Sequence, residues 1–440
     1  MKKNYSVIIL GGGVSGTALW YALQKYTNIK SIGLIEKHSD FGMVASHSTQ
    51  NSQTLHFGDI ETNYSYEKAS SVSKGASYVK NYLDTFGKED KIHSVFHKMV
   101  LAVGPEEVEI LRKRYSKFKK LFPKLKILER DEIQKLEPMI VKGRPKNEPL
   151  LALWSPDGYT VDYGALSRSF IKRMNKSSDI FLNTTVTNIQ KTNSGYKLTT
   201  TKGVFTCDFL ACDAGSMSIA FAKLLGYGKH LSIFSVAGNF YKGPEVLKGK
   251  VYTMQIDKLP FAAVHGDPDV WGSGYTRFGP SAKVIFMLER YNYKTVLNYM
   301  KTFVWNTAGL KSVVNIGFDK IYFNYMFKNM LYDLPIIGNW LFAKNAKKIV
   351  PTIDRWSIKK DKGYGATRPQ IIDTQTKSIS MGEARIEGWH SVFNITPSPG
   401  ASTCLANAKR DSQFIVDTLG MEYTFKTAMF DKDLSDINKK

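Results

Sequence analysis

Two short apolar runs separated by a glycine-rich turn open the chain. Residues 7–10 (VIIL) form the first run, and residues 31–35 (SIGLI) contain the second. Residues 14–24 lie between them and have the composition and spacing of a helix. The pattern therefore predicts a strand, a tight turn, a helix and a second strand within the first thirty-six residues.

Further along, helical and strand-like patterns alternate. Helices are expected over residues 67–86, 106–122, 164–174 and 401–419, and strands over 180–186, 196–201 and 205–213. The helix at 106–122 is amphipathic, with a basic side that suits solvent or, alternatively, lipid. Its apolar face contains Val108, Leu111, Tyr115, Phe118 and Phe122. Residues 231–348 are rich in β-branched and aromatic residues, which predicts a mixed second domain where substrate chemistry is expected.

The first turn contains the spacing of a dinucleotide-binding fingerprint. Gly11 permits the tight turn, Gly13 lets the backbone approach a pyrophosphate, and Gly16 lets the helix lie close to the strand. Val14 and Ser15 begin the helix, whose free N–H groups and dipole would face the phosphates. We therefore expect a dinucleotide at this turn.

Glu36 ends the second apolar run, about 20 residues after the last glycine of the fingerprint. A carboxylate there accepts hydrogen bonds from ribose hydroxyls, and it disfavours a cofactor with a 2′-phosphate. The polar stretch 46–58 then interrupts the β–α alternation. This interruption favours a long flavin cofactor over a nicotinamide.

The length of 440 residues is too great for one compact core and predicts two domains. We expect an α/β fold of mixed α+β character, in which a two-dinucleotide-binding-type FAD domain and a mixed-sheet substrate domain are both built from discontinuous segments. The FAD-binding segments are predicted as 1–85, 151–225 and 356–428, the substrate segments as 86–150 and 226–355, and a loose tail as 429–440.

Charge and cysteine content narrow the possible partners and location. The chain has 61 basic and 39 acidic residues, a net charge of +22, which attracts nucleic acid, anionic lipid or an anionic substrate. The sequence contains no zinc-finger, RRM, Walker A, HExxH or GxSxG motif. No motif therefore supports a nucleic-acid, NTPase, zinc-protease or serine-hydrolase function, and no metal site is predicted.

The three cysteines, Cys207, Cys212 and Cys404, form no CxxC pair and are expected to be buried thiols in a reducing compartment. The N-terminus lacks the shape of a signal peptide and no apolar run approaches the length of a membrane span, which predicts a cytoplasmic protein or one on the cytoplasmic face of a membrane.

Four further stretches, together with the N-terminal fingerprint, resemble the FAD-dependent D-amino-acid-oxidase-type superfamily, and specifically its malate:quinone oxidoreductase family. The stretches are NSQTLHFG (51–58) with ETNY (61–64), PFAAVHGD (260–267) with TRFGP (276–280), GATRPQ (365–370) and SPGAST (398–403). The resemblance extends over essentially the whole chain. It implies oxidation of L-malate to oxaloacetate with bound FAD, and transfer of the electrons to a membrane quinone.

The resemblance also implies which residues contact the cofactor. They are Gly11, Gly13, Val14, Ser15, Gly16, Glu36, Lys37, Asn51, Ser52, Val186, Ala214, Gly215, Pro399, Gly400, Ala401 and Ser402. Pro399 needs no N–H partner at the start of a helix, so residues 398–400 are expected to begin a helix whose amides face the flavin N1 and O2 edge.

Two arginines and two histidines are the candidate catalytic residues. Arg277 and Arg368 suit a dicarboxylate, because a guanidinium binds a carboxylate through two parallel hydrogen bonds, although either one can instead be a salt-bridge residue. His265 is our candidate for the base that takes the hydroxyl proton of malate. His56 is expected to lie along the flavin, where positioning is its predicted role.

The motifs leave the 2-hydroxy acid open. The larger branch of the family has a Gly-Thr-Gly-His type sequence where this chain has QTLH at 53–56, and L-2-hydroxyglutarate dehydrogenases share the histidine and arginine stretches. An L-2-hydroxyglutarate dehydrogenase is therefore the nearest alternative. A non-catalytic, RNA-associated protein with a flavin fold is the alternative from another class.

A quinone dissolves in lipid, so an enzyme that reduces it must reach the bilayer. We expect a peripheral contact with an anionic membrane surface through one stretch that combines apolar residues and lysines. It contains Phe323, Tyr325, Phe327, Leu331, Ile336, Ile337, Trp340, Leu341, Phe342, Lys344, Lys347 and Lys348. The alternative is that these apolar residues are the core of the second domain.

Overall fold

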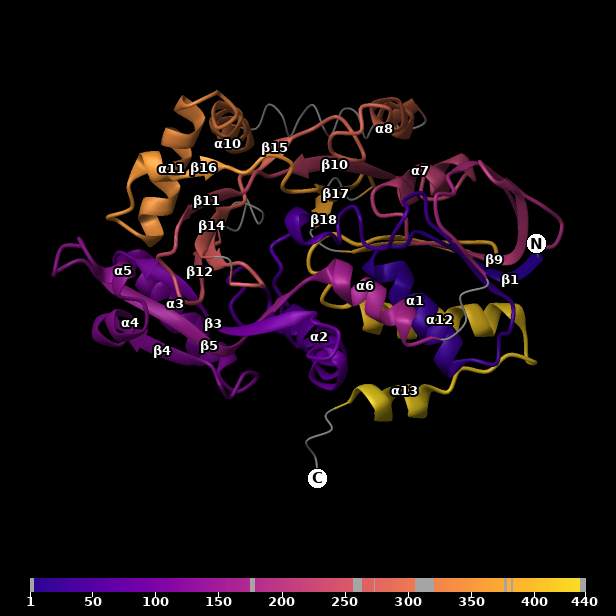
Figure 1. Ribbon diagram of the computed structural model, residues 1–440, viewed down its shortest axis with the longest axis horizontal. Helices are drawn as coiled ribbons and strands as arrows, with labels where there is room; N and C mark the ends of the chain where they lie inside the picture. Colours follow the sequence, from indigo (N-terminus) through magenta and orange to yellow (C-terminus); the bar gives the residue numbers. More distant parts are fainter. Residues whose placement is uncertain are drawn as a thin grey trace.

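The computed structural model describes residues 4–174, 179–255, 263–272, 274–304, 320–375, 378–380 and 383–435. The described strands form three sheets. The molecule is elongated, with the sheet that contains β1 and β9 toward one end and the sheet that contains β3 and β5 toward the other (Figure 1). This arrangement confirms the predicted mixed α/β fold.

The first sheet is mainly parallel and has the order β19-β20-β9-β1-β2-β6, with β7 and β8 attached to β9. The strand expected at 205–213 pairs in parallel with the first strand, with Ile8 opposite Leu210, so the sheet is completed from distant parts of the chain. Its strands are β1 (Asn4–Leu10), β2 (Ile32–Ile35), β6 (Ile180–Phe181), β7 (Val186–Lys191), β8 (Tyr196–Thr200), β9 (Gly203–Cys212), β19 (Ala384–Gly388) and β20 (Ser391–Ile395).

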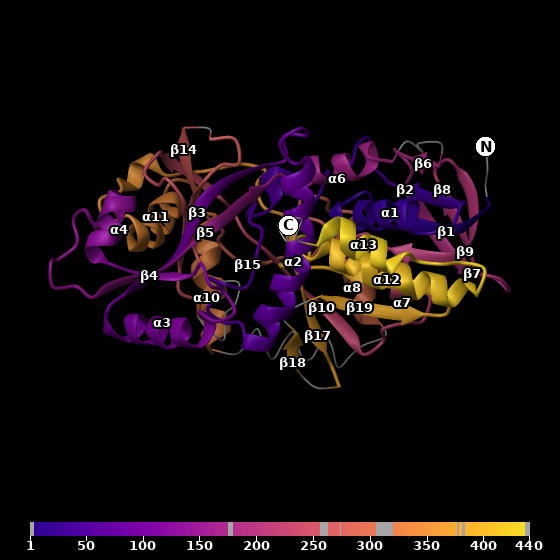
Figure 2. The ribbon, with the colours of Figure 1, turned by 90° about the horizontal axis from the view of Figure 1, so that it is seen from below.

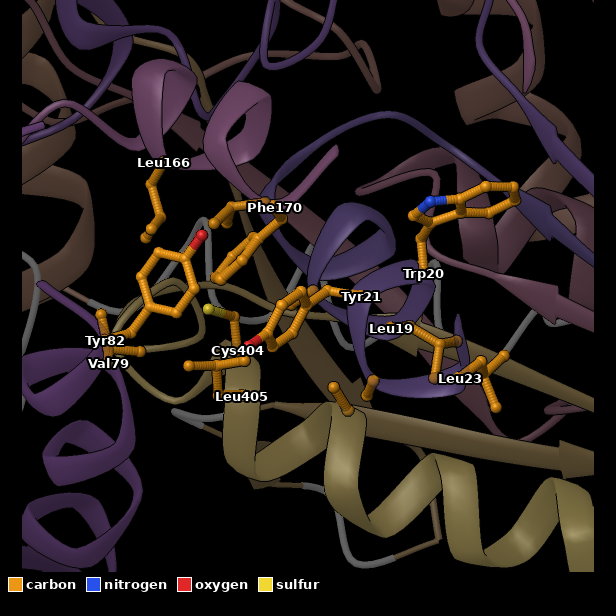
Figure 3. Close-up of a cluster of buried hydrophobic side chains, with 14 of the residues drawn as sticks. Leu19, Trp20, Tyr21, Leu23, Val79, Tyr82, Leu166, Phe170, Cys404 and Leu405 are labelled. Atoms are coloured by element: carbon orange, nitrogen blue, oxygen red, sulfur yellow. The ribbon is translucent and has the colours of Figure 1, made fainter. Parts of the chain in front are cut away.

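Helices cover one face of this sheet. They are α1 (Val14–Tyr26), α2 (Tyr66–Phe86), α6 (Tyr163–Lys172), α12 (Cys404–Leu419) and α13 (Thr427–Leu434). Figure 2 shows α12 and α13 beside α1, and Figure 3 shows the buried side chains that α1, α2, α6 and α12 contribute to their shared core. Val7 and Ile9 of β1 belong to this core, whereas Ile8 and Leu10 belong to the core on the other face. Residues 7–10 of the first strand are therefore all apolar, because both faces of the strand are buried there.

The second and third sheets form the remainder of the scaffold. The second has the order β16-β11-β14-β13-β12-β3-β5-β4, and the third has the order β15-β10-β17-β18. The strands of the second are β3 (His93–Val103), β4 (Lys126–Glu129), β5 (Leu150–Val161), β11 (Tyr241–Pro244), β12 (Lys250–Thr253), β13 (His265–Pro268), β14 (Tyr275–Gly279) and β16 (Lys359–Lys360). Those of the third are β10 (Leu231–Ala237), β15 (Lys283–Val284), β17 (Thr367–Asp373) and β18 (Ser378–Ser380).

The remaining helices pack around the three sheets or on the connections between strands. They are α3 (Pro105–Phe118), α4 (Arg130–Leu136), α5 (Pro138–Val141), α7 (Met217–Leu224), α8 (Thr295–Val304), α10 (Lys320–Leu331) and α11 (Ile337–Ile349), with 3-10 turns η1 (Ser48–Gln50) and η2 (Arg355–Ser357). In the described part of the chain, none of the helices is both long and apolar enough to span a bilayer.

Three expectations about element boundaries were wrong. Residues 398–403 form turns, and the helix expected from residue 398 begins at Cys404. The strand expected at 180–186 is two short strands, because the chain turns between β6 and β7. Residues 429–434 are not a loose tail, because they belong to α13, whose Phe430 and Leu434 are buried. The last five residues, 436–440, lie outside the described part, and the segment boundaries of the two domains stay a prediction.

Candidate functional site

A cavity of about 620 Å³ is lined by residues from all three sheets and their connecting loops. One part of its wall comes from the β1–α1 turn and the end of β2, and another comes from β12, β13 and β17. Most of the predicted cofactor residues line it: Gly11, Gly13, Val14, Ser15, Glu36, Lys37, Asn51, Ser52, Val186, Ala214, Gly215, Pro399, Ala401 and Ser402. His56, His265 and Arg368 line the same cavity. Gly16, Gly400 and Arg277 do not, although each lies close behind residues that do.

The glycine turn has the shape that a pyrophosphate requires. Gly11 has a φ of +109°, and a Cβ there would lie 2.4 Å from the Asp213 carbonyl oxygen. A Cβ on Gly16 would lie 2.0 Å from the Gly11 carbonyl oxygen, so neither position accepts a side chain. At Gly13 the nearest atom to such a Cβ is the Ser46 hydroxyl oxygen at 3.4 Å, an ordinary contact, and Gly13 lines the cavity at the N-terminus of α1. These observations fit a dinucleotide cofactor held against the turn.

Glu36 is buried in the cavity wall at the end of β2. Its carboxylate accepts hydrogen bonds from the backbone N–H groups of Gly12, at 2.6 Å, and His38, at 2.8 Å. These bonds tie the acid to the glycine turn. Lys37 forms an ion pair with Glu289 at the edge of the cavity.

The 398–403 turn lies against the cavity without the helix start that we expected. The Gly400 and Ser402 N–H groups donate to the carbonyls of Pro397 and Pro399, both at 2.7 Å. These two amides are therefore already engaged and are not free donors for a flavin. Ser402 has another role, because its hydroxyl accepts from the His56 N–H at 2.9 Å.

Arg368 projects from β17 as a cation of the cavity wall. Burial, and secondarily the charge of Arg290, lower the pKa of Arg368 to about 10, so the guanidinium stays protonated at neutral pH. Among the described residues, no carboxylate lies within ion-pair distance of it. An arginine without a carboxylate partner inside a cavity is suited to bind an anion.

Arg277 differs from Arg368 because it is fully buried and lies behind the cavity wall. Its Nη2 donates to Asp267 Oδ2 at 2.9 Å and to the Ser52 carbonyl at 3.2 Å. Lys250 donates to the same Asp267 oxygen at 2.7 Å. Arg277 therefore occupies the place of a buried ion-pair residue, while its Nε and Nη1 have no hydrogen-bond partner among the described residues, and its role as a substrate clamp stays a prediction.

His265, on β13, is 3% exposed and belongs to this cationic cluster. Its Nε2 is buried without a hydrogen-bond partner among the described residues and lies 3.7 Å from Asp267 Oδ1. Burial and the charges of Lys250, Arg277 and Arg368 lower the pKa of His265 to about 3, although Asp267 opposes the shift. Its imidazole is neutral at physiological pH.

His56 also lines the cavity, but its neighbour is an acid. Its Nδ1 lies 2.5 Å from Glu61 Oε1, and Glu61 is 5% exposed. The two cavity histidines therefore have opposite electrostatic surroundings.

Sequence reasoning gave no role to several residues that form the site. Glu61 stands in one of the stretches that carry the family resemblance. It follows His56 through an irregular loop, where no periodicity predicts that the two side chains meet. Asp267 was more accessible to prediction, because it follows His265 by two residues and so shares its face of the strand. Ser46, whose hydroxyl accepts from the Val14 N–H at 3.0 Å, comes from the polar stretch after the second strand. Residues 260–262 of the quoted motif lie outside the described part of the chain.

A second candidate surface is formed by α10 and α11, which contact one another. We define the α10–α11 surface by its exposed apolar residues: Phe323, Phe327, Met330, Leu334, Ile336, Ile337 and Trp340. Phe342 was wrongly placed in this group, because it is buried and stacks on Tyr241. Lys344 is exposed, whereas Lys348 pairs with Glu107 of α3 at 2.5 Å.

Sequence comparisons identify relatives over nearly the full length of the chain. Residues 3–332 match the model of the family described as malate:quinone oxidoreductase. A probable malate:quinone oxidoreductase of Campylobacter jejuni is 39% identical over 436 residues, which cover 96% of this chain and 97% of that protein. A malate:quinone oxidoreductase of Helicobacter pylori strain J99 is 38% identical over 447 residues, which cover 99% of both.

Solved structures share the fold at low sequence identity. A glycine oxidase from Geobacillus kaustophilus has a TM-score of 0.65 and 17% identity, and the match covers 98% of both chains. An L-α-glycerophosphate oxidase from Mycoplasma pneumoniae, solved with FAD bound, has a TM-score of 0.64 and 17% identity over 94% of this chain and 95% of that one.

Proposed function

Because this chain belongs to the malate:quinone oxidoreductase family, we propose that it oxidises L-malate to oxaloacetate and passes the two electrons to a membrane quinone. The observation that supports this reaction most strongly is one shared cavity. It joins a dinucleotide cradle to two histidines and to an arginine that has no carboxylate partner in the described part of the chain.

FAD is the proposed cofactor. The Gly13 amide and the N-terminus of α1 would hold the pyrophosphate, and Glu36 would accept from the ribose. Lys37, Val186, Ala214 and Gly215 would line the adenosine end. Asn51, Ser52, Pro399, Ala401 and Ser402 would lie along the flavin. Bound FAD supplies the acceptor for the hydride that leaves C2 of malate.

Arg368 is the proposed anchor for a malate carboxylate. Unlike Arg277 and Lys250, it lines the cavity, and it lacks an acidic partner among the described residues. His265 lies next to it in the cavity wall and, as a neutral imidazole, can hydrogen-bond the substrate. Arg277 and Lys250 stand behind His265 and hold Asp267 and the Ser52 carbonyl. Their proposed role is to position the wall.

The test of this function is anaerobic mixing of the purified flavoprotein with a panel of 2-hydroxy acids, followed by the flavin absorbance. We expect L-malate to bleach the flavin faster than L-2-hydroxyglutarate, L-lactate or D-malate. Bleaching by L-2-hydroxyglutarate in preference to malate would change the substrate. No bleaching by any 2-hydroxy acid would overturn the function.

The cofactor assignment has its own test at Glu36. Glu36→Arg should lose flavin, because a cation replaces the acceptor of the ribose hydroxyls and of the Gly12 N–H. Glu36→Gln keeps an acceptor at the same place and is the matched control. Flavin content per folded protein, measured by absorbance, should fall strongly in Glu36→Arg and only slightly in Glu36→Gln. Equal flavin content in both variants would refute the assignment.

We also propose that the α10–α11 surface docks on the inner face of an anionic membrane without crossing it. Ile336 and Ile337 are 69% and 57% exposed, and Phe323 and Phe327 are exposed on the preceding helix. Lys320, Lys328 and Lys344 are exposed on the same two helices, and each lysine near an anionic surface contributes about 1 kcal/mol. Aromatic and aliphatic side chains beside lysines suit the headgroup region of a bilayer.

Replacing both isoleucines with aspartate tests this surface. The Ile336→Asp/Ile337→Asp protein should lose co-sedimentation with phosphatidylglycerol vesicles and activity with a quinone in those vesicles, yet keep activity with a water-soluble dye. Leu224→Asp is the matched control, because Leu224 is an exposed apolar residue of α7, away from the α10–α11 surface. If Ile110→Asp on α3 causes the loss instead, the contact is the basic amphipathic helix.

A further inference from the structure

His56 and Glu61 form a hydrogen-bonded pair in the cavity wall. The distance from His56 Nδ1 to Glu61 Oε1 is 2.5 Å, so Nδ1–H donates to the carboxylate. An imidazole that donates through Nδ1 has its lone pair on Nε2. That nitrogen is the one left to accept a proton from a bound substrate.

The loop that contains Glu61 is held in place from a neighbouring helix. Arg114 of α3 is 8% exposed and donates to the carbonyls of Gly58, at 3.3 Å, and Tyr64, at 3.1 Å. The His56 backbone is held separately by the Ser402 hydroxyl. Both partners of the pair therefore have fixed backbones, and their side chains meet without a change in the loop.

The surroundings of Glu61 keep it ionised. Burial alone would raise its pKa, but the hydrogen bond from His56, the charge of the His56 imidazolium when it forms and the charge of Lys98 lower the pKa of Glu61 well below its ordinary value. Lys98 is itself paired with Asp59 at 2.7 Å. The other titratable or charged groups that interact with Glu61 are Tyr64, Lys68, Arg114 and Tyr252.

We propose that His56 is the base of the reaction and that Glu61 is its positioning residue. Glu61 fixes the tautomer with the lone pair on Nε2 and stabilises the imidazolium that forms, as an acid does beside a catalytic histidine in other enzymes. The hydroxyl proton of malate moves to His56 Nε2, the C2–H bonding pair leaves as hydride to the bound flavin, and C2–O becomes the carbonyl of oxaloacetate. This inference rests on the proposed function and assigns the base that the sequence had placed at His265.

The test measures anaerobic flavin reduction by malate, as a function of pH, in the flavin-loaded protein and its variants. Glu61→Gln removes the negative charge but keeps an acceptor for Nδ1–H. We expect the limiting reduction rate to fall by on the order of 10- to 100-fold, with less effect on the apparent malate dissociation constant. The acidic limb of the rate profile should move to lower pH, because the imidazole loses the charge that favours its protonated form.

Glu61→Asp is the second variant, and it keeps the charge at a longer distance. It should recover part of the rate and most of the position of the acidic limb. A merely structural role for Glu61 would lower flavin content or rate in both variants without moving the limb. Flavin content is measured first for each protein.

The chain offers a matched control in a second histidine–glutamate pair. His97 Nε2 lies 2.9 Å from Glu137 Oε1, and neither residue lines the cavity. His97→Asn breaks that pair and should leave the reduction rate and the pH profile unchanged.

The outcomes separate the inference from the function on which it rests. If malate fails to reduce the flavin of the natural protein, the proposed function fails and the inference fails with it. If malate reduces the natural protein but Glu61→Gln has a normal rate and an unshifted limb, only the inference is overturned. A slower rate together with a shifted limb supports it.

Discussion

The two histidines line the same cavity, but the charged groups that surround them differ. His56 has an ionised glutamate at 2.5 Å, whereas His265 has Lys250, Arg277 and Arg368 around it and one aspartate at 3.7 Å. A negative neighbour favours the protonated imidazole, and positive neighbours disfavour it. Proximity to a substrate therefore does not by itself identify a base. At His265, burial first and the surrounding cations second keep the imidazole neutral, although Asp267 opposes them. At His56, the proposed base, the ring is held by its hydrogen bond to the Glu61 carboxylate.

The largest expected effect on flavin reduction comes from replacing each histidine with asparagine, one at a time. His56→Asn should lower the limiting rate of flavin reduction by on the order of 10²- to 10⁴-fold, the usual contribution of a general base. His265→Asn should lower this rate by less than about 10-fold and mainly weaken malate binding, because it removes a hydrogen-bonding group from the wall. Rapid-reaction reduction across malate concentrations separates the two effects. If His265→Asn lowered the reduction rate more than His56→Asn, His265 would be the base.

The two arginines, Arg277 and Arg368, extend the comparison to binding. Arg368→Lys should raise the malate dissociation constant by about 10- to 100-fold, because a charged hydrogen-bond pair contributes about 1.5–3 kcal/mol and a point charge does not reproduce it. Arg277→Lys should change the dissociation constant by much less, since Arg277 does not line the cavity. Flavin absorbance titrations with malate give both constants. Equal weakening by both changes would mean that Arg277 reaches the substrate.

The smallest effect is on stability as a function of pH. Burial, with the cations around it, lowers the pKa of His265 from 6.5 to about 3, so the unfolded chain binds this proton below about pH 6.5 and the folded protein does not until about pH 3. Stability present above pH 6.5 is therefore lost as the pH falls through this window, at up to about 1.4 kcal/mol per pH unit. His265→Gln should remove this part of the slope between pH 6.5 and 5 in denaturant unfolding curves.

The His56→Gln protein should keep the slope of stability between pH 6.5 and 5, because this variant still contains His265. The Glu61 carboxylate acts in a lower window, since its pKa falls from 4.5 to about 2. If the slope above pH 5 persists in His265→Gln, His265 is not held neutral in the folded protein.

The nucleotide end of the cavity was predictable from the sequence because its chemistry is local. Gly11, Gly13, Gly16 and Glu36 act through backbone geometry that short-range spacing determines, and the structure places them around one turn. The parallel pairing of β9 with β1 was also predictable, since an apolar strand closing on Ala214–Gly215 belongs beside the first one.

The reaction end was less predictable because its contacts join segments that lie far apart in the chain. Arg368 and Arg277 have the same side chain in similar motifs, yet only the first lines the cavity. Arg277 lies on β14, which pairs with β13, and it is bound to Asp267 of that neighbouring strand. The 398–403 stretch shows another limit. Pro399 suited a helix start, but hydrogen bonds within the stretch form turns and delay the helix to Cys404.

The most direct measurement is a double-mutant cycle on flavin reduction by malate with His56→Asn, Glu61→Gln and the protein that contains both changes. If Glu61 acts only through His56, as we propose, the double variant should reduce its flavin no more slowly than His56→Asn alone. Rate losses that multiply in the double variant would contradict this proposal, because they would mean that Glu61 and His56 act independently.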